Sequence, residues 1–83
     1  MASFDRAETL NKVVEVVAKI LKVEKNTVVP TATLQDLGAD SLDMAEIIIK
    51  LEEVFGIEIN DDDAEKLHNV NEVVEYVHNL RTK

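Results

Sequence analysis

Apolar residues recur every three or four positions in three stretches of the chain, which predicts three helices that each bury one face. The first helix is expected from about Phe4 to Leu21, where either Ser3 or Asp5 can cap its start. The apolar residues of this helix form one stripe, which is expected to face a core: Val13, Val14, Val17, Ile20 and Leu21.

The second helix is expected from Ser41 to Phe55, and Gly56 stands where a C-cap glycine belongs. Its main stripe follows the spacing of a buried helix face and consists of Met44, Ile47, Ile48, Leu51 and Phe55. Ile57 and Ile59 then predict a loop that is anchored to the core.

Two further helices are predicted in the last third of the chain. Asp61 to Leu67 fits a short helix capped by Asn60, and Val70 to Leu80 fits a longer one. Asn69 and Glu72 have the spacing of a capping box at the start of the longer helix. The face that this helix buries is expected to consist of Val70, Val73, Val74 and Val77.

A long connection joins the first two helices, from Lys22 to Asp40, and contains the breakers Asn26, Pro30 and Gly38. Its regularly placed apolar residues predict an ordered loop, with a short turn near Thr33 to Leu37. The side chains expected to hold it on the bundle are Val23, Val28, Val29, Leu34 and Leu37. We therefore predict an all-α fold, a four-helix bundle of three longer helices and one short helix, with a long first loop, as a single domain over residues 1–83.

Charge and composition narrow the partners. The 83 residues have a formal net charge of −8, which argues against nucleic acid and against an anionic membrane surface, and favours a monomer that meets proteins with basic patches. There is no cysteine, so any thiol chemistry must come from an attached group. With no signal pattern at the start and no apolar run of membrane length, we expect a cytoplasmic protein or a mature one from an organelle interior.

Ser41 follows Gly-Ala-Asp and opens the second helix, so two interpretations compete. A serine near a helix start usually caps it. The same position exposes the hydroxyl beside free backbone N–H groups, which favour a phosphate. A catalytic serine needs a base within reach, and His68 and His78 lie far off in sequence, so a hydrolase is disfavoured.

Acidic residues gather on and beside the second helix, at Asp40, Asp43, Glu46, Glu52 and Glu53. Leu42, Ala45 and Ile49 form a second apolar stripe outside the main one. An apolar seam in an acidic surface suits docking of a basic protein face. For Ile49, a wide core stripe is an equally weighted alternative. The run Asp61-Asp62-Asp63 lacks the spacing of a calcium loop and is interpreted as a helix start, so no metal site is predicted.

The segment Leu37-Gly38-Ala39-Asp40-Ser41-Leu42-Asp43 resembles the phosphopantetheine attachment motif of acyl carrier proteins of the stand-alone, fatty-acid-synthesis type. The likeness continues through Glu46, through residues 51–59 and 61–66, and through residues 73–77. The resemblance implies that Ser41 carries 4′-phosphopantetheine, transferred from coenzyme A, whose thiol holds growing fatty acyl chains as thioesters. It implies that partner enzymes contact Asp40, Leu42, Asp43, Glu46, Ile49 and Glu53. It also implies an apolar shelter for the acyl chain near Ile47, Leu51, Phe55, Ile59 and Leu67.

By the same resemblance the chain is a carrier and not an enzyme. The implied partners are a holo-acyl-carrier-protein synthase, the malonyl transferase, ketoacyl synthases, reductases and dehydratase of fatty acid synthesis, and acyltransferases. Two residues depart from the family pattern: Thr33 replaces a large apolar residue, and Lys50 adds a positive charge to the acidic helix. A structural subunit with the same fold, and a carrier of another acid such as a polyketide or D-alanyl group, remain alternatives.

Overall fold

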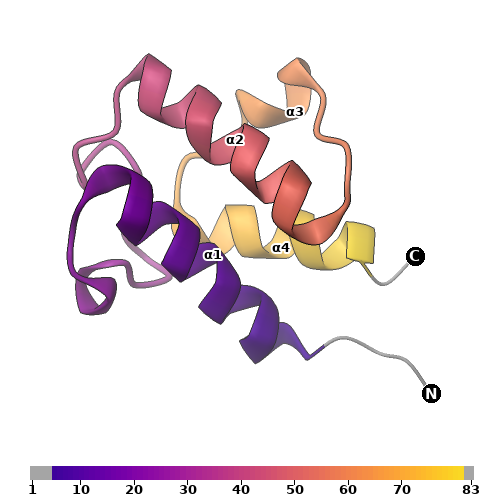
Figure 1. Ribbon diagram of the computed structural model, residues 1–83, viewed down its shortest axis with the longest axis horizontal. Coiled ribbons are helices and arrows are strands. Elements are labelled where there is room, and N and C mark those ends of the chain that lie inside the picture. Colours follow the sequence, from indigo (N-terminus) through magenta and orange to yellow (C-terminus); the bar gives the residue numbers. More distant parts are fainter. Residues whose placement is uncertain (1–4, 82–83) are drawn as a thin grey trace.

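Four α-helices and one 3-10 helix follow one another in the computed structural model, which describes residues 5–81 (Figure 1). Their order is α1 (Arg6–Leu21), η1 (Lys25–Thr27), α2 (Ser41–Phe55), α3 (Asp61–Ala64) and α4 (Val70–Arg81). Across residues 5–81 no β-strand forms, and an isolated bridge pairs Thr33 with Asn69. The predicted all-α bundle of three longer helices and one short helix is confirmed.

α1 begins after Asp5, whose carboxylate accepts a hydrogen bond from the Ala7 N–H at 3.0 Å. Of the two predicted caps, Asp5 therefore acts as one, while Ser3 and the predicted first residue Phe4 lie outside the described residues. The helix ends at Lys22, which adopts the left-handed conformation with φ 58°. A β-carbon makes this conformation costly, which is why glycine is usual at such a position.

α2 has the bounds that the sequence predicts. Its first residue is Ser41, and Gly56 closes it in the left-handed conformation with φ 64°.

Among the described helices, none is long and apolar enough to cross a membrane.

α3 is shorter than predicted, because it ends at Ala64 and not at Leu67. The next residues form a tight turn in which the Lys66 and Leu67 N–H groups bond the third residue back. This turn places Leu67 in the core, with 6% of its surface exposed. The His68 carbonyl then accepts a hydrogen bond from the Leu34 N–H at 2.9 Å, so a contact with a distant loop ends the helix.

α4 extends one residue past the predicted end and begins with the predicted capping box. Asn69 accepts a hydrogen bond from the Glu72 N–H at 2.8 Å, and the Glu72 carboxylate accepts one from the Asn69 N–H at 3.1 Å. The four valines expected on the inner face of this helix are buried.

The core forms where α1 packs against both α2 and α4, as Figure 1 shows. Its fully buried members are aliphatic, each contributing about 1.5–3 kcal/mol when removed from water. From α1 and α2 they are Val13, Val17, Ile47 and Leu51, as the stripes predict. The other members of the two predicted stripes are only partly buried, at the edge of this core: Val14, Ile20 and Leu21 on α1, and Met44, Ile48 and Phe55 on α2.

The long loop is ordered and is fastened to the start of α4. Val28 and Leu34 are buried as predicted, whereas Val29 is 43% exposed and does not anchor the loop. The Val70 and Asn71 N–H groups each donate at 3.0 Å to carbonyls of this loop. These hydrogen bonds fix the loop that precedes Ser41 against the chain that follows α3.

Candidate functional site

Ser41 is the first residue of α2 and is exposed, but it is not the cap. Asp40 takes that role: its carboxylate accepts from the Asp43 N–H at 2.9 Å. The Asp43 carboxylate in turn accepts from the Asp40 N–H at 3.1 Å, which closes a capping box. The expectation that Ser41 caps the helix is therefore wrong, and its hydroxyl is not engaged in holding the helix start.

The helix start fits a phosphate ester on Ser41. The backbone N–H groups of the first turn and the positive end of the helix dipole favour a negative group there. A β-carbon on Gly38 would meet no atom within 4 Å, so the loop before the serine leaves open space. The carboxylates of Asp40 and Asp43 oppose a further negative charge, although both are held by backbone N–H groups. A covalent phosphopantetheine fits these residues, and when bound it would supply a thiol that the cysteine-free chain lacks.

An open groove of about 1100 Å³ lies between α2 and α3, and Ser41 forms part of its wall. The residues that line it on α2 share one face of that helix: Ser41, Met44, Ala45, Ile48, Ile49 and Glu52. At 1.5 Å per residue this face extends about 16 Å from the serine. This volume lies just above the range of about 300–1,000 Å³ that is typical of small-molecule pockets.

The groove departs from the shelter implied by the resemblance. Ile59 and Leu67 line it, but Ile47, Leu51 and Phe55 do not. Ile47 and Leu51 are fully buried against α1, on the other side of α2. On the described surface, the apolar space next to Ser41 therefore lies between α2 and α3 and not in the centre of the bundle.

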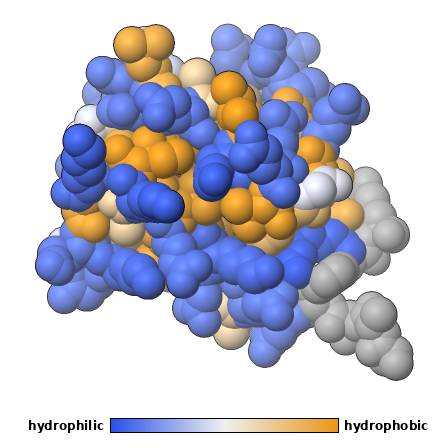
Figure 2. Space-filling model, viewed as in Figure 1, coloured by the Kyte–Doolittle hydropathy of each residue, from blue (hydrophilic) through white to orange (hydrophobic). Residues whose placement is uncertain are grey.

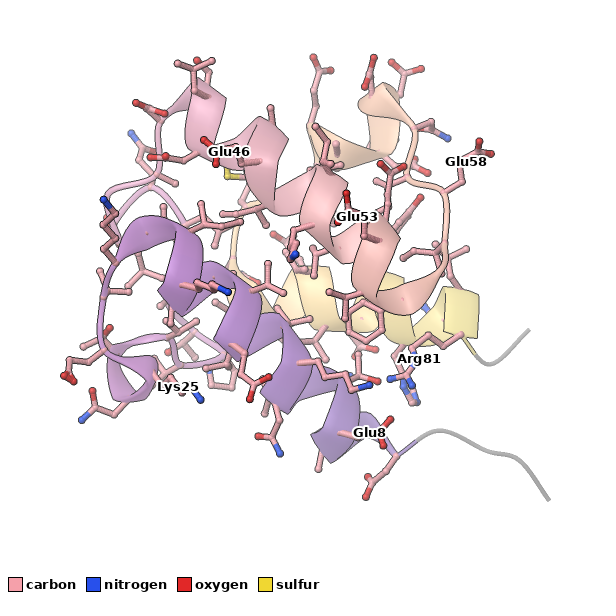
Figure 3. All side chains as sticks on the ribbon, in the orientation of Figure 1. Glu8, Lys25, Glu46, Glu53, Glu58 and Arg81 are labelled. Atoms are coloured by element: carbon pink, nitrogen blue, oxygen red, sulfur yellow. The ribbon has the colours of Figure 1, made fainter. Side chains whose placement is uncertain are left out.

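The six predicted docking residues lie at the start and on the outer side of α2. Leu42 is 73% exposed and Ile49 is 56% exposed, so the wide-core alternative for Ile49 is excluded. Glu46 and Glu53 project from the same side of α2, two turns apart (Figure 3). Apolar side chains show among hydrophilic ones along this part of the surface (Figure 2).

Lys50 modifies the acidic surface at one end. Its ammonium lies 3.8 Å from the Glu53 carboxylate, three residues on, and both side chains are about half exposed or more. This ion pair partly offsets the charge of Glu53 and leaves the charge of Glu46 unchanged.

Glu52 has a structural role that the sequence pattern did not indicate. Its carboxylate accepts a hydrogen bond from the Ile59 N–H at 2.8 Å, across the turn at Gly56. This contact fixes the loop that leads into α3. No local signal predicts it, because the two residues are seven apart and separated by a helix end.

The two histidines occupy different environments. The His78 Nδ1 atom lies 3.1 Å from the Thr9 hydroxyl, at the packed ends of α1 and α4. His68 lines the same groove as Ser41, and no hydrogen bond joins these two side chains among the described contacts. Within residues 5–81, no group of three or more carboxylate or imidazole side chains is arranged to hold a metal ion.

Comparison with known proteins agrees with this geometry. A family profile described as a phosphopantetheine attachment site matches residues 11–77. The chain is 50% identical over 74 residues to an acyl carrier protein of Rubrobacter xylanophilus, covering 88% of this chain and 91% of the relative. It is 47% identical over 76 residues to one of Thermosynechococcus vestitus, covering 90% and 94% of the two chains.

A solved structure of an acyl carrier protein from Enterococcus faecalis superposes with a TM-score of 0.78 at 35% identity, covering 93% of this chain and 99% of that one. A mitochondrial acyl carrier protein of Dictyostelium discoideum is 41% identical over 80 residues, which cover 96% of this chain and 67% of the relative. The chain therefore belongs to the acyl carrier protein family and carries acyl chains on a 4′-phosphopantetheine group.

Proposed function

We propose that Ser41 is the attachment point of the phosphopantetheine arm, through which the chain shuttles growing fatty acyl groups between the enzymes of fatty acid synthesis. The observation that carries this assignment is the free hydroxyl of Ser41 at the capped start of α2, on the wall of the groove. Because Asp40 and Asp43 hold the helix start without it, the serine can be modified without disturbing the fold.

In this function the protein's own residues position the attached arm and shelter its acyl cargo, and the arm supplies the thiol. A tether fixed at Ser41 raises the effective concentration of its cargo at any enzyme that docks nearby. The apolar part of the groove wall, including Met44, Ile48 and Leu67, offers an acyl chain a place out of water. We propose that the chain itself makes and breaks no bonds.

The outer side of α2 is the proposed docking surface. Exposed Leu42 and Ile49 offer apolar contact, and the acidic groups around them attract basic patches on the partners. The partners proposed are the holo-synthase, malonyl transferase, ketoacyl synthases, reductases, dehydratase and acyltransferases. A monomeric state and a cytoplasmic location remain predictions.

The attachment residue can be tested by mass. The chain has two serines, Ser3 and Ser41, which gives a matched control. After incubation with coenzyme A and a broad holo-synthase, wild type and Ser3→Ala should gain one phosphopantetheine unit, and Ser41→Ala should gain none. Peptide mapping of the modified chain should place the added mass on Ser41. Modification of the Ser41→Ala protein, or an unmodified wild type, would overturn the assignment.

A further inference from the structure

α3 is held in place by contacts at its ends, by Ala64, which packs against the core, and by one hydrogen bond from α4. It has four residues, and none of its side chains is buried. At one end Glu52 binds the Ile59 N–H, and at the other Leu67 enters the core. A helix this short has little stability of its own, so its position depends on these contacts.

A side-chain hydrogen bond joins α3 to α4 on the side of α3 that faces away from the groove. The Tyr76 hydroxyl donates a hydrogen bond to the Asp63 carboxylate at 2.7 Å, a short bond between a neutral donor and a charged acceptor. Asp61, Ala64 and Glu65 line the groove, and Asp63 does not. Asp63 thus faces α4 while the opposite side of α3 forms the groove wall.

We propose that Tyr76 and Asp63 are positioning residues that fix the distance of α3 from α2 and thereby determine which acyl chains the groove accepts. The inference rests on the proposed function, because it assigns the groove to the cargo attached at Ser41. The hydrogen bond ties α3 to α4, so we expect its loss to let α3 move relative to α2.

The donor is present throughout the physiological pH range. Burial, together with the hydrogen bond to Asp63, raises the pKa of Tyr76 to about 12. Because Tyr76 is the single tyrosine of the chain, an absorbance titration reports this group alone. Asp63→Ala should lower its midpoint only part of the way, because burial, the larger cause of the raised pKa, remains, whereas Asp62→Ala should leave the midpoint unchanged.

Hydrogen exchange of the unmodified chain tests the positioning role. Tyr76→Phe keeps the ring that packs on the core and removes only the hydroxyl. The exchange rate of the Ala64 to Leu67 amides should rise by roughly tenfold or more, the effect of losing one hydrogen bond to a charged group. The amides of Val17 and Val74, in the core helices, should change less than twofold.

A matched pair of aspartates separates the hydrogen bond from general charge effects. Asp63→Ala should reproduce the change seen in Tyr76→Phe, and Asp62→Ala, on the same helix and exposed, should not. In a double-mutant cycle, the amide exchange rate of the Tyr76→Phe, Asp63→Ala double variant should exceed that of either single variant by no more than twofold. Each substitution removes the same contact, so the second should add little to the first. Additive effects, or unchanged exchange in Tyr76→Phe, would overturn the proposal.

Acyl-group protection tests selectivity. Wild type loaded with octanoyl or acetyl groups would be treated with hydroxylamine, and the octanoyl thioester should cleave at least threefold more slowly. In Tyr76→Phe this difference should fall below twofold, while cleavage of the acetyl form stays the same. An unaltered octanoyl advantage in the variant would overturn the assigned selectivity. Failure of the wild type to be loaded would instead refute the Ser41 assignment, and the exchange result would still stand.

Discussion

Asp40 and Asp43 each accept a hydrogen bond from the other's backbone N–H, at 2.9 and 3.1 Å, and together they form the start of α2 on either side of Ser41. Asp40→Ala should therefore lower the free energy of unfolding by about 1 kcal/mol, the usual cost of a lost cap. Ser41→Ala should change it by less than about 0.5 kcal/mol, as is typical of exposed positions. In a domain of this size the first change lowers the melting temperature by roughly 4–8 °C.

Thermal unfolding followed by circular dichroism measures both variants. Asp43→Ala is a second check, because it removes the other half of the box and should also destabilise. If Ser41→Ala lowered the free energy of unfolding more than Asp40→Ala does, the serine and not Asp40 would be the cap of α2.

Local signals were sufficient to predict α2 and α4. Gly56 supplies the left-handed end of α2, and Asn69 with Glu72 supplies the capping box of α4, so both can be recognised within a few residues. α3 could not be delimited in this way. Its end is set by the pairing of His68 with Leu34, which lie far apart in the chain.

The site, too, has features that local sequence signals predict and features that depend on contacts between distant residues. The exposed position of Ser41 and the outward-facing Ile49 follow from helix periodicity once α2 is assigned. The groove does not, because its second wall depends on where α3 rests. That position is set by Glu52 and by Tyr76 with Asp63, contacts that connect separate elements and leave no periodic trace in the sequence.

Charge reversal on α2 should weaken docking in a salt-dependent manner. Glu46→Lys combined with Glu53→Lys should lower affinity for a partner such as the holo-synthase by about tenfold at low salt, if each lost pair is worth about 0.7 kcal/mol. The effect should largely disappear as the Debye length falls from about 30 Å at 0.01 M to about 3 Å at 1 M salt.

The control for charge reversal is Glu24→Lys with Glu58→Lys, which alters net charge equally at exposed positions outside α2. This control should retain most of the affinity at every salt concentration, as measured by fluorescence anisotropy or calorimetry. Equal losses in both double variants would show that total charge matters and that α2 is not the docking surface.

Lys22 and Gly56 end α1 and α2 with nearly the same left-handed backbone, at φ 58° and 64°. Lys22→Gly should raise the free energy of unfolding by about 0.5 kcal/mol, since it relieves about 1–2 kcal/mol of strain and adds roughly 0.5–1 kcal/mol of unfolded-chain entropy. Gly56→Ala should lower it by about 0.5 kcal/mol for the opposite reason. Urea unfolding measures both, and Lys22→Ala, which keeps the strain, should be nearly neutral; a gain there equal to that of glycine would contradict the backbone explanation.

Glu72 links the stability of the α4 start to pH. Its carboxylate accepts from the His68 N–H at 2.9 Å and the Asn69 N–H at 3.1 Å, and these bonds, the His68 one foremost, hold the pKa of Glu72 below its ordinary value. A lowered pKa in the folded state means that the ionised form stabilises the fold. That stabilisation is complete above about pH 4.3, the value in an unfolded chain, and is lost as the pH falls through the lower folded-state value.

Glu72→Gln retains an acceptor oxygen and removes the charge, so it isolates this effect. Wild type should be more stable than the variant at pH 7, and the difference should shrink as the pH is lowered from 5 to about 3 in urea unfolding at constant salt. Glu58→Gln, at an exposed loop position, provides the reference for a simple loss of charge. A difference between wild type and Glu72→Gln that grows toward acid pH would mean that the neutral carboxyl is the better partner of the two N–H groups, which is the reverse of the geometry at this helix start.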